Sequence, residues 1–465
     1  MVRSGGEMDS LGKDAMAPRR HLWAYVWRAT LALLLCCVAL VLVLRWHWRR
    51  EFSRRIEAIR AAGYPATPQE LDAWYKYPQS GVNAAHWIME AGALYVEPSK
   101  EDWERLLPIV FRTRHSDPTD PARALDPDLM RLLEQYVQVN STALKSLYDG
   151  AAIDECRYPT DLSKGAGVVM THISHVREGM LMLCLEAVLH AERGDPNRAV
   201  EAIQTSLHVT GTLDDEPVMV SHMVAASGAS VASVTLERML NRVELTDAQL
   251  ETLCEAFLDR SGHEGLLTAL VGERCLTYPL FDSPQTLDRT YHDHLAPKAL
   301  LEIYDGFGLA ARDGIGYLGF IEECIRIAQS PVSRHGAGVE AARARWLRDR
   351  KSILFSQIGY GAHAMIYEAT HASPREMARV LLAVERFRLA HGTLPDAIDS
   401  LVPQYLSSVP EDPHDGKPLR YKRLDRGYMV YSVGEDGRDD GGKQAPPKDA
   451  RKSNETWDFV FQVRR

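Results

Sequence analysis

The longest hydrophobic segment of the chain lies close to its first residue. Residues 22–44 contain one charged side chain, Arg28, and consist mainly of Leu, Val and Ala. As an α-helix such a segment is roughly 34 Å long, enough to cross a bilayer core of about 30 Å. Trp23 and Trp46 lie near its two ends, as aromatic side chains do at a membrane interface. The pattern predicts one transmembrane helix, with the lipid bilayer as its partner.

The alternative for this segment is a cleaved signal peptide, whose hydrophobic core usually has about 7–15 residues. The run found here is longer, and Arg45-Trp-His-Trp-Arg-Arg50 follows it in place of the small residues of a cleavage site. We therefore predict a signal anchor. We expect residues 1–21 to form a disordered tail, residues 22–44 to cross the membrane once, and residues 45–65 to form a charged stem.

From residue 66 to residue 370 apolar side chains recur at the spacing of α-helices, which predicts an α-helical central domain. The clearest element is a helix pair interrupted at Gly194-Asp-Pro-Asn197. Asp195 is suited to cap the second helix and Pro196 to begin it. The pair resembles half of a tetratricopeptide unit. No second copy follows at that repeat's period, so we interpret it as an antiparallel helix pair.

Four short fragments of the middle region are Asn83-Ala-Ala85, Cys156-Arg-Tyr-Pro159, Glu216-Pro217 and Gly272-Glu-Arg274. They resemble an uncharacterised family of bacterial envelope proteins over residues 80–330. The resemblance implies a location in the envelope, and no activity comes with it.

The pattern changes at residues 373–465. Ser373-Pro-Arg-Glu376 has the form of a capping box, and the helix it predicts runs to Ala390, with Gly392 as its stop. Three segments with strand character follow, at residues 419–422, 428–433 and 459–463. We expect a mainly α protein that ends in a small α+β module, a long helix on a three-stranded antiparallel sheet.

Several motifs of this module are specific: Glu385-Arg-Phe-Arg-Leu-Ala-His-Gly392, Val409-Pro-Glu-Asp-Pro413 and Tyr431-Ser-Val-Gly-Glu-Asp-Gly437. They resemble the C-terminal domain of the G-type major pseudopilin of type II secretion, which forms a thin periplasmic filament. Pseudopilins have a prepilin peptidase site, and their membrane helix leads directly into this domain. No motif of this kind precedes Leu22, and more than three hundred residues lie between residues 44 and 373. We therefore expect the module to be reused for interaction rather than for a processed filament.

Many of those pseudopilins bind calcium in the loop after the last motif. The resemblance implies calcium ligands at Asp436, at the Asp-Gly position, and at Asp458, before the last strand; Asp440 lies between them. Calcium prefers six to eight hard oxygen ligands, which acidic side chains and carbonyls of this loop can supply. A solvated acidic loop is the alternative, because the loop is longer than in the family and contains Pro446-Pro447.

Composition narrows the functional classes. Hydrophobic residues make up 45% and charged residues 25% of the 465 residues, which suits a packed globular body. A net charge of -9 argues against nucleic acid as a partner. The seven cysteines form no CxxC pair, so we interpret most as buried apolar residues and leave one disulfide open. His292-x-His294 lacks a third metal ligand at a recognised spacing, and no catalytic motif is present.

These observations predict a membrane-anchored envelope protein with a protein-interaction or scaffolding role, linked to secretion by the resemblance. The alternatives are an enzyme with its active site in the helical domain, and a pilin-like filament subunit. Arginines after the membrane segment outnumber the basic residues before it, which favours a cytoplasmic body. The resemblance favours an extracytoplasmic one, and we expect the bulk of the chain outside the cytoplasm.

Overall fold

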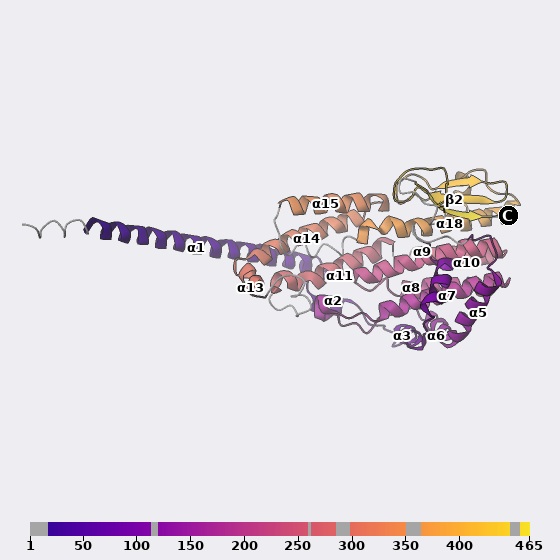
Figure 1. Ribbon diagram of the computed structural model, residues 1–465, viewed down its shortest axis with the longest axis horizontal. Coiled ribbons are helices and arrows are strands. Elements are labelled where there is room, and N and C mark those ends of the chain that lie inside the picture. Colours follow the sequence, from indigo (N-terminus) through magenta and orange to yellow (C-terminus); the bar gives the residue numbers. More distant parts are fainter. Residues whose placement is uncertain (1–16, 113–119, 259–261, 285–297, 350–363, 447–455) are drawn as a thin grey trace, which may run out of the picture. The chain divides into compact units, whose positions relative to one another are not determined.

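The computed structural model describes residues 17–112, 120–258, 262–284, 298–349, 364–446 and 456–465 (Figure 1). The described chain is mainly helical, with 15 α-helices and a three-stranded antiparallel sheet near its end, which confirms the predicted fold class in outline. It divides into two compact units. The first consists of residues 1–61 and 279–316, and the second of residues 62–278 and 317–465, in each case as far as they are described.

The helices before the sheet follow one another through the chain in this order: α1 (Ala17–Ala61), α2 (Pro68–Trp74), α3 (Ala85–Leu94), α4 (Lys100–Val110), α5 (Pro127–Val139), α6 (Ser141–Ala151), α7 (His172–Glu192), α8 (Pro196–Gly211), α9 (Met219–Arg242), α10 (Asp247–Phe257), α11 (Gly262–Asp282), α13 (Lys298–Gly306), α14 (Leu309–Ala328), α15 (His335–Asp349) and α18 (Glu368–His391). The 3₁₀ turns η1 (Leu162–Gly167), η3 (Val332–Arg334), η4 (Ala364–Ile366) and η5 (Ile398–Leu401) separate some of them.

In the first unit, α1 continues from its apolar stretch into a charged stem without a break, and it begins at Ala17 rather than at Leu22. Phe52 and Ile56 of the stem are buried. Gly314 of α14 faces the Phe52 ring, where a Cβ would lie 2.6 Å from Cε2. Glycine is therefore needed for α14 to approach the stem this closely.

Two helices in the described chain are long and apolar enough to cross a membrane, α1 and α9. The most apolar stretch of α1 has no buried residues, whereas 56% of the most apolar stretch of α9 is buried. α9 is buried because it packs its apolar side chains into the core of the second unit. α1 is thus the candidate span, as predicted.

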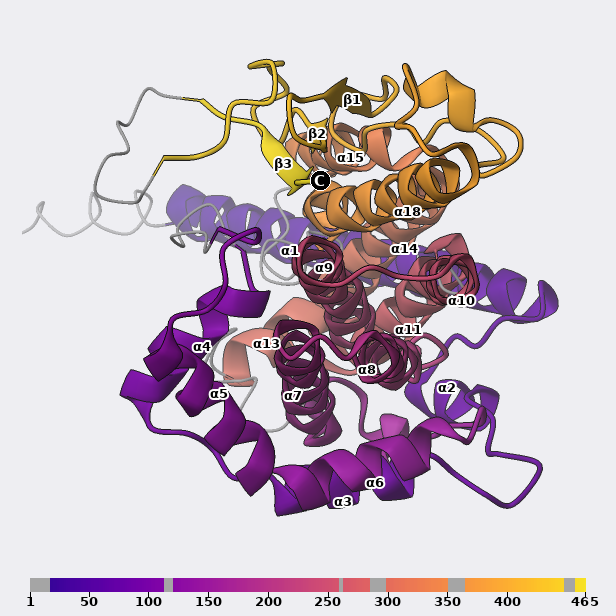
Figure 2. The same ribbon diagram turned by 90° about the vertical axis from the view of Figure 1, so that its right-hand side faces the viewer.

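The core of the second unit is built around α7, α8 and α9, which lie side by side (Figure 2). The predicted helix pair is confirmed: α7 ends at Glu192, and Asp195 accepts a hydrogen bond of 3.2 Å from the Arg198 N–H to cap α8. Leu183, Ile203 and Leu236 are fully buried between these helices. α18 packs on α9 and α10 and lies between them and the sheet.

The long helix of the C-terminal module begins earlier than the sequence predicts. α18 starts at Glu368, and Ser373 does not cap it but donates a hydrogen bond of 2.8 Å to the Ala369 carbonyl one turn back. Pro374 is accommodated inside the helix. A tertiary contact favours the extra turn, since the Glu368 carboxylate lies 3.2 Å from Nε2 of His222 on α9. The predicted stop is confirmed, with Gly392 in the left-handed conformation that glycine adopts without strain.

The sheet has the order β1 (Arg420–Arg423), β2 (Tyr428–Ser432), β3 (Phe459–Val463), with both pairs antiparallel. Its buried face, formed by Tyr428, Val430 and Phe461, joins the same hydrophobic core as α18. The Tyr428 hydroxyl also donates a hydrogen bond of 2.9 Å to the Glu385 carboxylate of α18. The three strands lie within one or two residues of where the sequence places them.

The outer edge of β3 is occupied by side chains of α9. Glu237 accepts a hydrogen bond of 2.7 Å from the Gln462 N–H, and Asn241 donates one of 2.8 Å to the Gln462 carbonyl and accepts one of 2.8 Å from the Arg464 N–H. These two side chains, one helical turn apart, supply the partners that a further strand would otherwise provide. The sheet is thereby joined to the helical core.

Candidate binding site

A cavity of about 540 Å³ lies in the second unit where α4, α9 and α18 meet the loops of the C-terminal module. Its volume is in the range of small-ligand sites, roughly 300–1,000 Å³. Its lining combines apolar and polar side chains. The apolar ones include Val110, Phe111, Val231, Val234, Phe459 and Val460, and the polar ones include Arg112, Asp120, His371, His414, Glu435, Asp436, Asp458 and Arg464.

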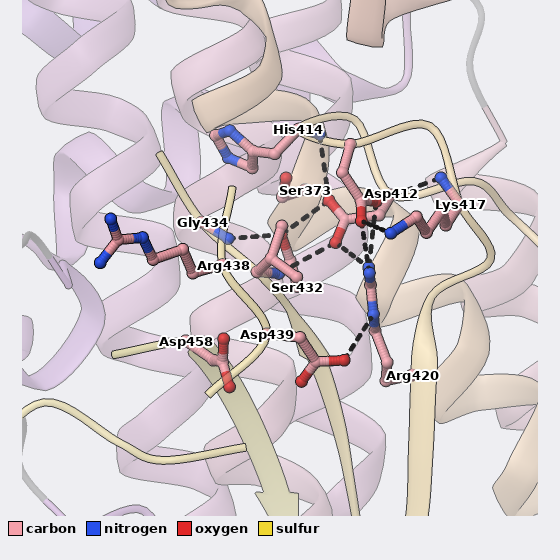
Figure 3. A network of polar contacts seen from close by, with 12 residues as sticks. Ser373, Asp412, His414, Lys417, Arg420, Ser432, Gly434, Arg438, Asp439 and Asp458 are labelled. Atoms are coloured by element: carbon pink, nitrogen blue, oxygen red, sulfur yellow. Dashed lines mark hydrogen bonds and ion pairs between the residues drawn. The ribbon is translucent and has the colours of Figure 1, made fainter. Parts of the chain in front are cut away.

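The loop that carries Glu435 and Asp436 to the cavity is held by a fully buried carboxylate, that of Asp412 (Figure 3). Asp412 accepts hydrogen bonds of 2.8 Å from the Ser432 hydroxyl and 2.9 Å from the Val433 N–H. It also binds the Arg420 guanidinium of β1. Two motifs singled out in the sequence, Val409-Pro-Glu-Asp-Pro413 and Tyr431-Ser-Val-Gly-Glu-Asp-Gly437, thus meet at one side chain.

The charges of the cavity are unevenly paired. Arg112 binds the buried Glu237 at 2.7 Å, and Arg464 binds Asp120 at 3.2 Å, so both cations already have acidic partners. On the acidic side, the Asp436 Oδ2 atom is buried with no hydrogen-bond partner among the described residues. Burial, together with the neighbouring Asp439 and Asp440, raises the pKa of Asp458. Among the described lining residues, negative charge therefore exceeds positive charge.

The cavity is also lined by two histidines, His371 and His414, that are not candidates in the sequence. Burial lowers the pKa of His371 and also that of His414, although carboxylates face both rings, Glu368 in the first case and Asp412 in the second. Both imidazoles are accordingly neutral near pH 7 and do not offset the negative charge. Isolated histidines at these positions have no spacing signal that would have revealed them.

The aspartates predicted as calcium ligands lie in this region, but they do not surround one point. Both Asp458 oxygens are occupied by backbone donors, the Asp440 N–H at 3.2 Å and the Gly442 N–H at 2.6 Å. Oδ2 of Asp436 and Oδ2 of Asp440 are each buried, and neither has a hydrogen-bond partner in the part of the chain that the structure describes. Within the described residues no group of three or more His, Cys, Asp or Glu is arranged to hold a metal. The described residues thus contain no ready-made cluster of carboxylates for the ion, and calcium binding stays a prediction.

A second polar cluster lies deeper in the helical core. The Glu216 carboxylate accepts a hydrogen bond of 2.6 Å from the Ser221 hydroxyl and lies 2.8 Å from Nε2 of His172. The His172 ring stacks on Tyr158, with centroids 4.2 Å apart. All four side chains are buried and paired with one another. We interpret this cluster as structural, since it contains serine, histidine and glutamate but offers no access to a substrate.

The envelope-family fragments converge near this cluster. Asn83 donates a hydrogen bond of 2.8 Å to the Arg157 carbonyl and accepts one of 3.0 Å from its N–H. Gly272 meets Pro217 so closely that a Cβ would lie 1.6 Å from the Pro217 carbonyl oxygen. Arg274 donates a hydrogen bond of 2.9 Å to the Pro65 carbonyl. The fragments therefore have packing roles here.

The remaining sequence candidates do not form a site. All seven cysteines are free thiols, with Cys36 and Cys37 exposed on α1. His292 and His294 lie outside the described residues. No family model, no curated protein and no solved structure matches this chain.

Proposed function

We propose that this protein is a single-pass envelope protein that binds other envelope proteins through the cavity beside its C-terminal sheet. The bilayer holds α1, and the body lies outside the cytoplasm. The cavity accepts a cationic side chain, lysine or arginine, from a protein partner. One observation carries this proposal: among the described lining residues, an excess of carboxylates surrounds a cavity whose own arginines are already paired.

The charge of the cavity selects the partner's chemistry. A buried carboxylate oxygen without a partner, such as Asp436 Oδ2, is costly. A cation placed against it relieves this cost and the repulsion that raises the pKa of Asp458. The apolar wall around Val231 and Phe459 suits the methylene stem of lysine or arginine, which packs on apolar surface while its charged end is paired.

Photo-crosslinking in the native membrane tests this binding. A benzophenone amino acid replaces Ser230, which lines the cavity from α9. We expect a protein adduct that Asp436→Asn weakens at least about tenfold, since losing one member of a desolvated ion pair costs about 2–5 kcal/mol. Asp425→Asn is the matched control, because it removes the same charge from an exposed turn of the same module. An adduct of equal yield in both variants would refute the proposal.

The link to secretion rests on the pseudopilin resemblance, and the identity of the adduct decides it. A secretion or other envelope component supports the link, and a cytoplasmic protein contradicts it. The two alternatives have separate tests. A pilin-like subunit predicts a trimmed N-terminus, which the mass of the mature protein reveals. An enzyme predicts a reaction that His371→Ala abolishes while binding persists.

A further inference from the structure

Helix α13, in the same unit as α1, has apolar side chains on two sides. Leu301 and Tyr304 are buried in the unit. Leu300, Ile303 and Phe307 are 45%, 57% and 48% exposed. Their spacing of three and four residues places them in a single stripe along the helix and the residue after it. Exposing three neighbouring large apolar side chains to water is unfavourable, and such a stripe is typical of a surface that contacts lipid or another protein.

The contacts of α13 determine which part of α1 it lies beside (Figure 1). Arg45, the residue directly after the apolar run, donates a hydrogen bond of 3.3 Å to the Gly306 carbonyl. Arg49, one turn further, binds the Asp305 carboxylate at 2.8 and 3.0 Å. Gly308 has φ +74° and comes so close that a Cβ would lie 2.7 Å from the Arg45 Cα. The end of α13 is thus held beside the first turn of the stem.

When the apolar run of α1 crosses the bilayer, the first turn of the stem and the end of α13 lie at the membrane interface. Residues 45–49 extend about 7.5 Å beyond Leu44, at about 1.5 Å per residue. The headgroup layer on each side of a bilayer is roughly 5–8 Å thick, and amphipathic helices lie in that layer with the apolar face about 5–10 Å deep. Trp46, 60% exposed with the Arg50 guanidinium 5.1 Å from its ring, is also typical of this layer.

We propose that α13 is an interfacial helix, whose stripe of Leu300, Ile303 and Phe307 inserts into the same bilayer that α1 crosses. The proposal rests on the membrane anchor described above. We assign lipid as the occupant because the stripe lies at the end of the apolar segment of α1. The side chains of that segment, from Trp23 to Val43, are mostly exposed, as lipid contact requires. α13 then fixes the tilt of the stem at the membrane surface and keeps the first unit against the lipid.

Photo-labelling of the full-length protein in lipid nanodiscs tests the proposal. A benzophenone amino acid is placed at Ile303 on the stripe, at the exposed Glu302 that points away from it, or at Leu35 within the apolar run. We expect lipid adducts at positions 303 and 35, and at 303 a yield several times that at 302. The same probe at Phe307 replaces one aromatic ring by another, which keeps the test open if the probe at Ile303 disturbs folding.

The outcomes separate the two proposals. Lipid adducts at 35 with none at 303 and 307 overturn the interfacial helix and leave the anchor. A crosslinked dimer from 303 and 307 in place of lipid adducts also overturns it, because the stripe then belongs to an interface between two copies. Absence of lipid adducts at 35 overturns the anchor itself, and the interfacial helix with it.

Discussion

The carboxylate of Asp412 offers the sharpest test of how the cavity loop is held. In Asp412→Asn the remaining side-chain oxygen can still accept from the Ser432 hydroxyl, but the new amide nitrogen faces the Val433 N–H and the Arg420 guanidinium, which are donors themselves. A buried donor left without an acceptor costs about 1–3 kcal/mol. Breaking a buried ion pair costs about 3–5 kcal/mol. Because Arg420 keeps Asp415, we expect a loss of about 4 kcal/mol in all.

This loss converts into a measurable melting shift. For a cooperative unit of roughly 370 residues, an unfolding entropy of about 2.1 cal/mol/K per residue gives a fall in Tm of about 5 °C. Thermal unfolding of the detergent-solubilised protein measures it, and hydrogen exchange of residues 433–436 should accelerate. The control is Asp396→Asn, which removes an ion pair whose aspartate side chain is 90% exposed and costs less than about 1 kcal/mol. Equal shifts in the two variants would show that the Asp412 carboxylate does not hold this loop.

Three further predictions concern other parts of the second unit. Burial alone would lower the pKa of His222, but the hydrogen bond to Glu368 outweighs burial and raises this pKa. The same bond lowers the pKa of Glu368, although burial acts to raise it. The pair therefore stabilises the fold most between about pH 4.5 and 6.5, and the Tm difference between wild type and His222→Asn should shrink above and below that window. Glu237→Ala leaves the Gln462 N–H and a guanidinium without their acceptor, so we expect a loss of about 3–5 kcal/mol in thermal unfolding; a loss under about 1 kcal/mol would show that the β3 edge is not held there. Calcium should raise the Tm relative to chelator in wild type and not in Asp436→Ala, and an equal response in both would end the calcium hypothesis.

The sequence predicts those elements whose signals are local. The apolar run of α1, the Asp195-Pro196 start of α8 and the Gly392 stop of α18 each depend on neighbouring residues, and all three are present in the structure. The predicted start of α18 is wrong, because a contact distant in sequence, between Glu368 and His222, adds a turn before the capping motif.

The cavity could not be predicted, because its walls come from segments far apart in the sequence. Phe111, Ser230, His371 and Trp457 have no common pattern, and they become neighbours only when the sheet packs on α18 and α9. The residue types of the acidic loop do predict a candidate site, and Glu435, Asp436 and Asp458 line the cavity. Their hydrogen bonds with backbone N–H groups, which set them apart from free metal ligands, depend on loop geometry that residue types do not determine.

The most direct test of the account is where the body of the protein lies. We predict that external protease digests the C-terminal part of the protein in intact spheroplasts, while a cytoplasmic marker survives and the anchor fragment stays in the membrane. A body that resists protease until the spheroplasts are lysed would place the cavity in the cytoplasm, and would contradict an envelope partner for it.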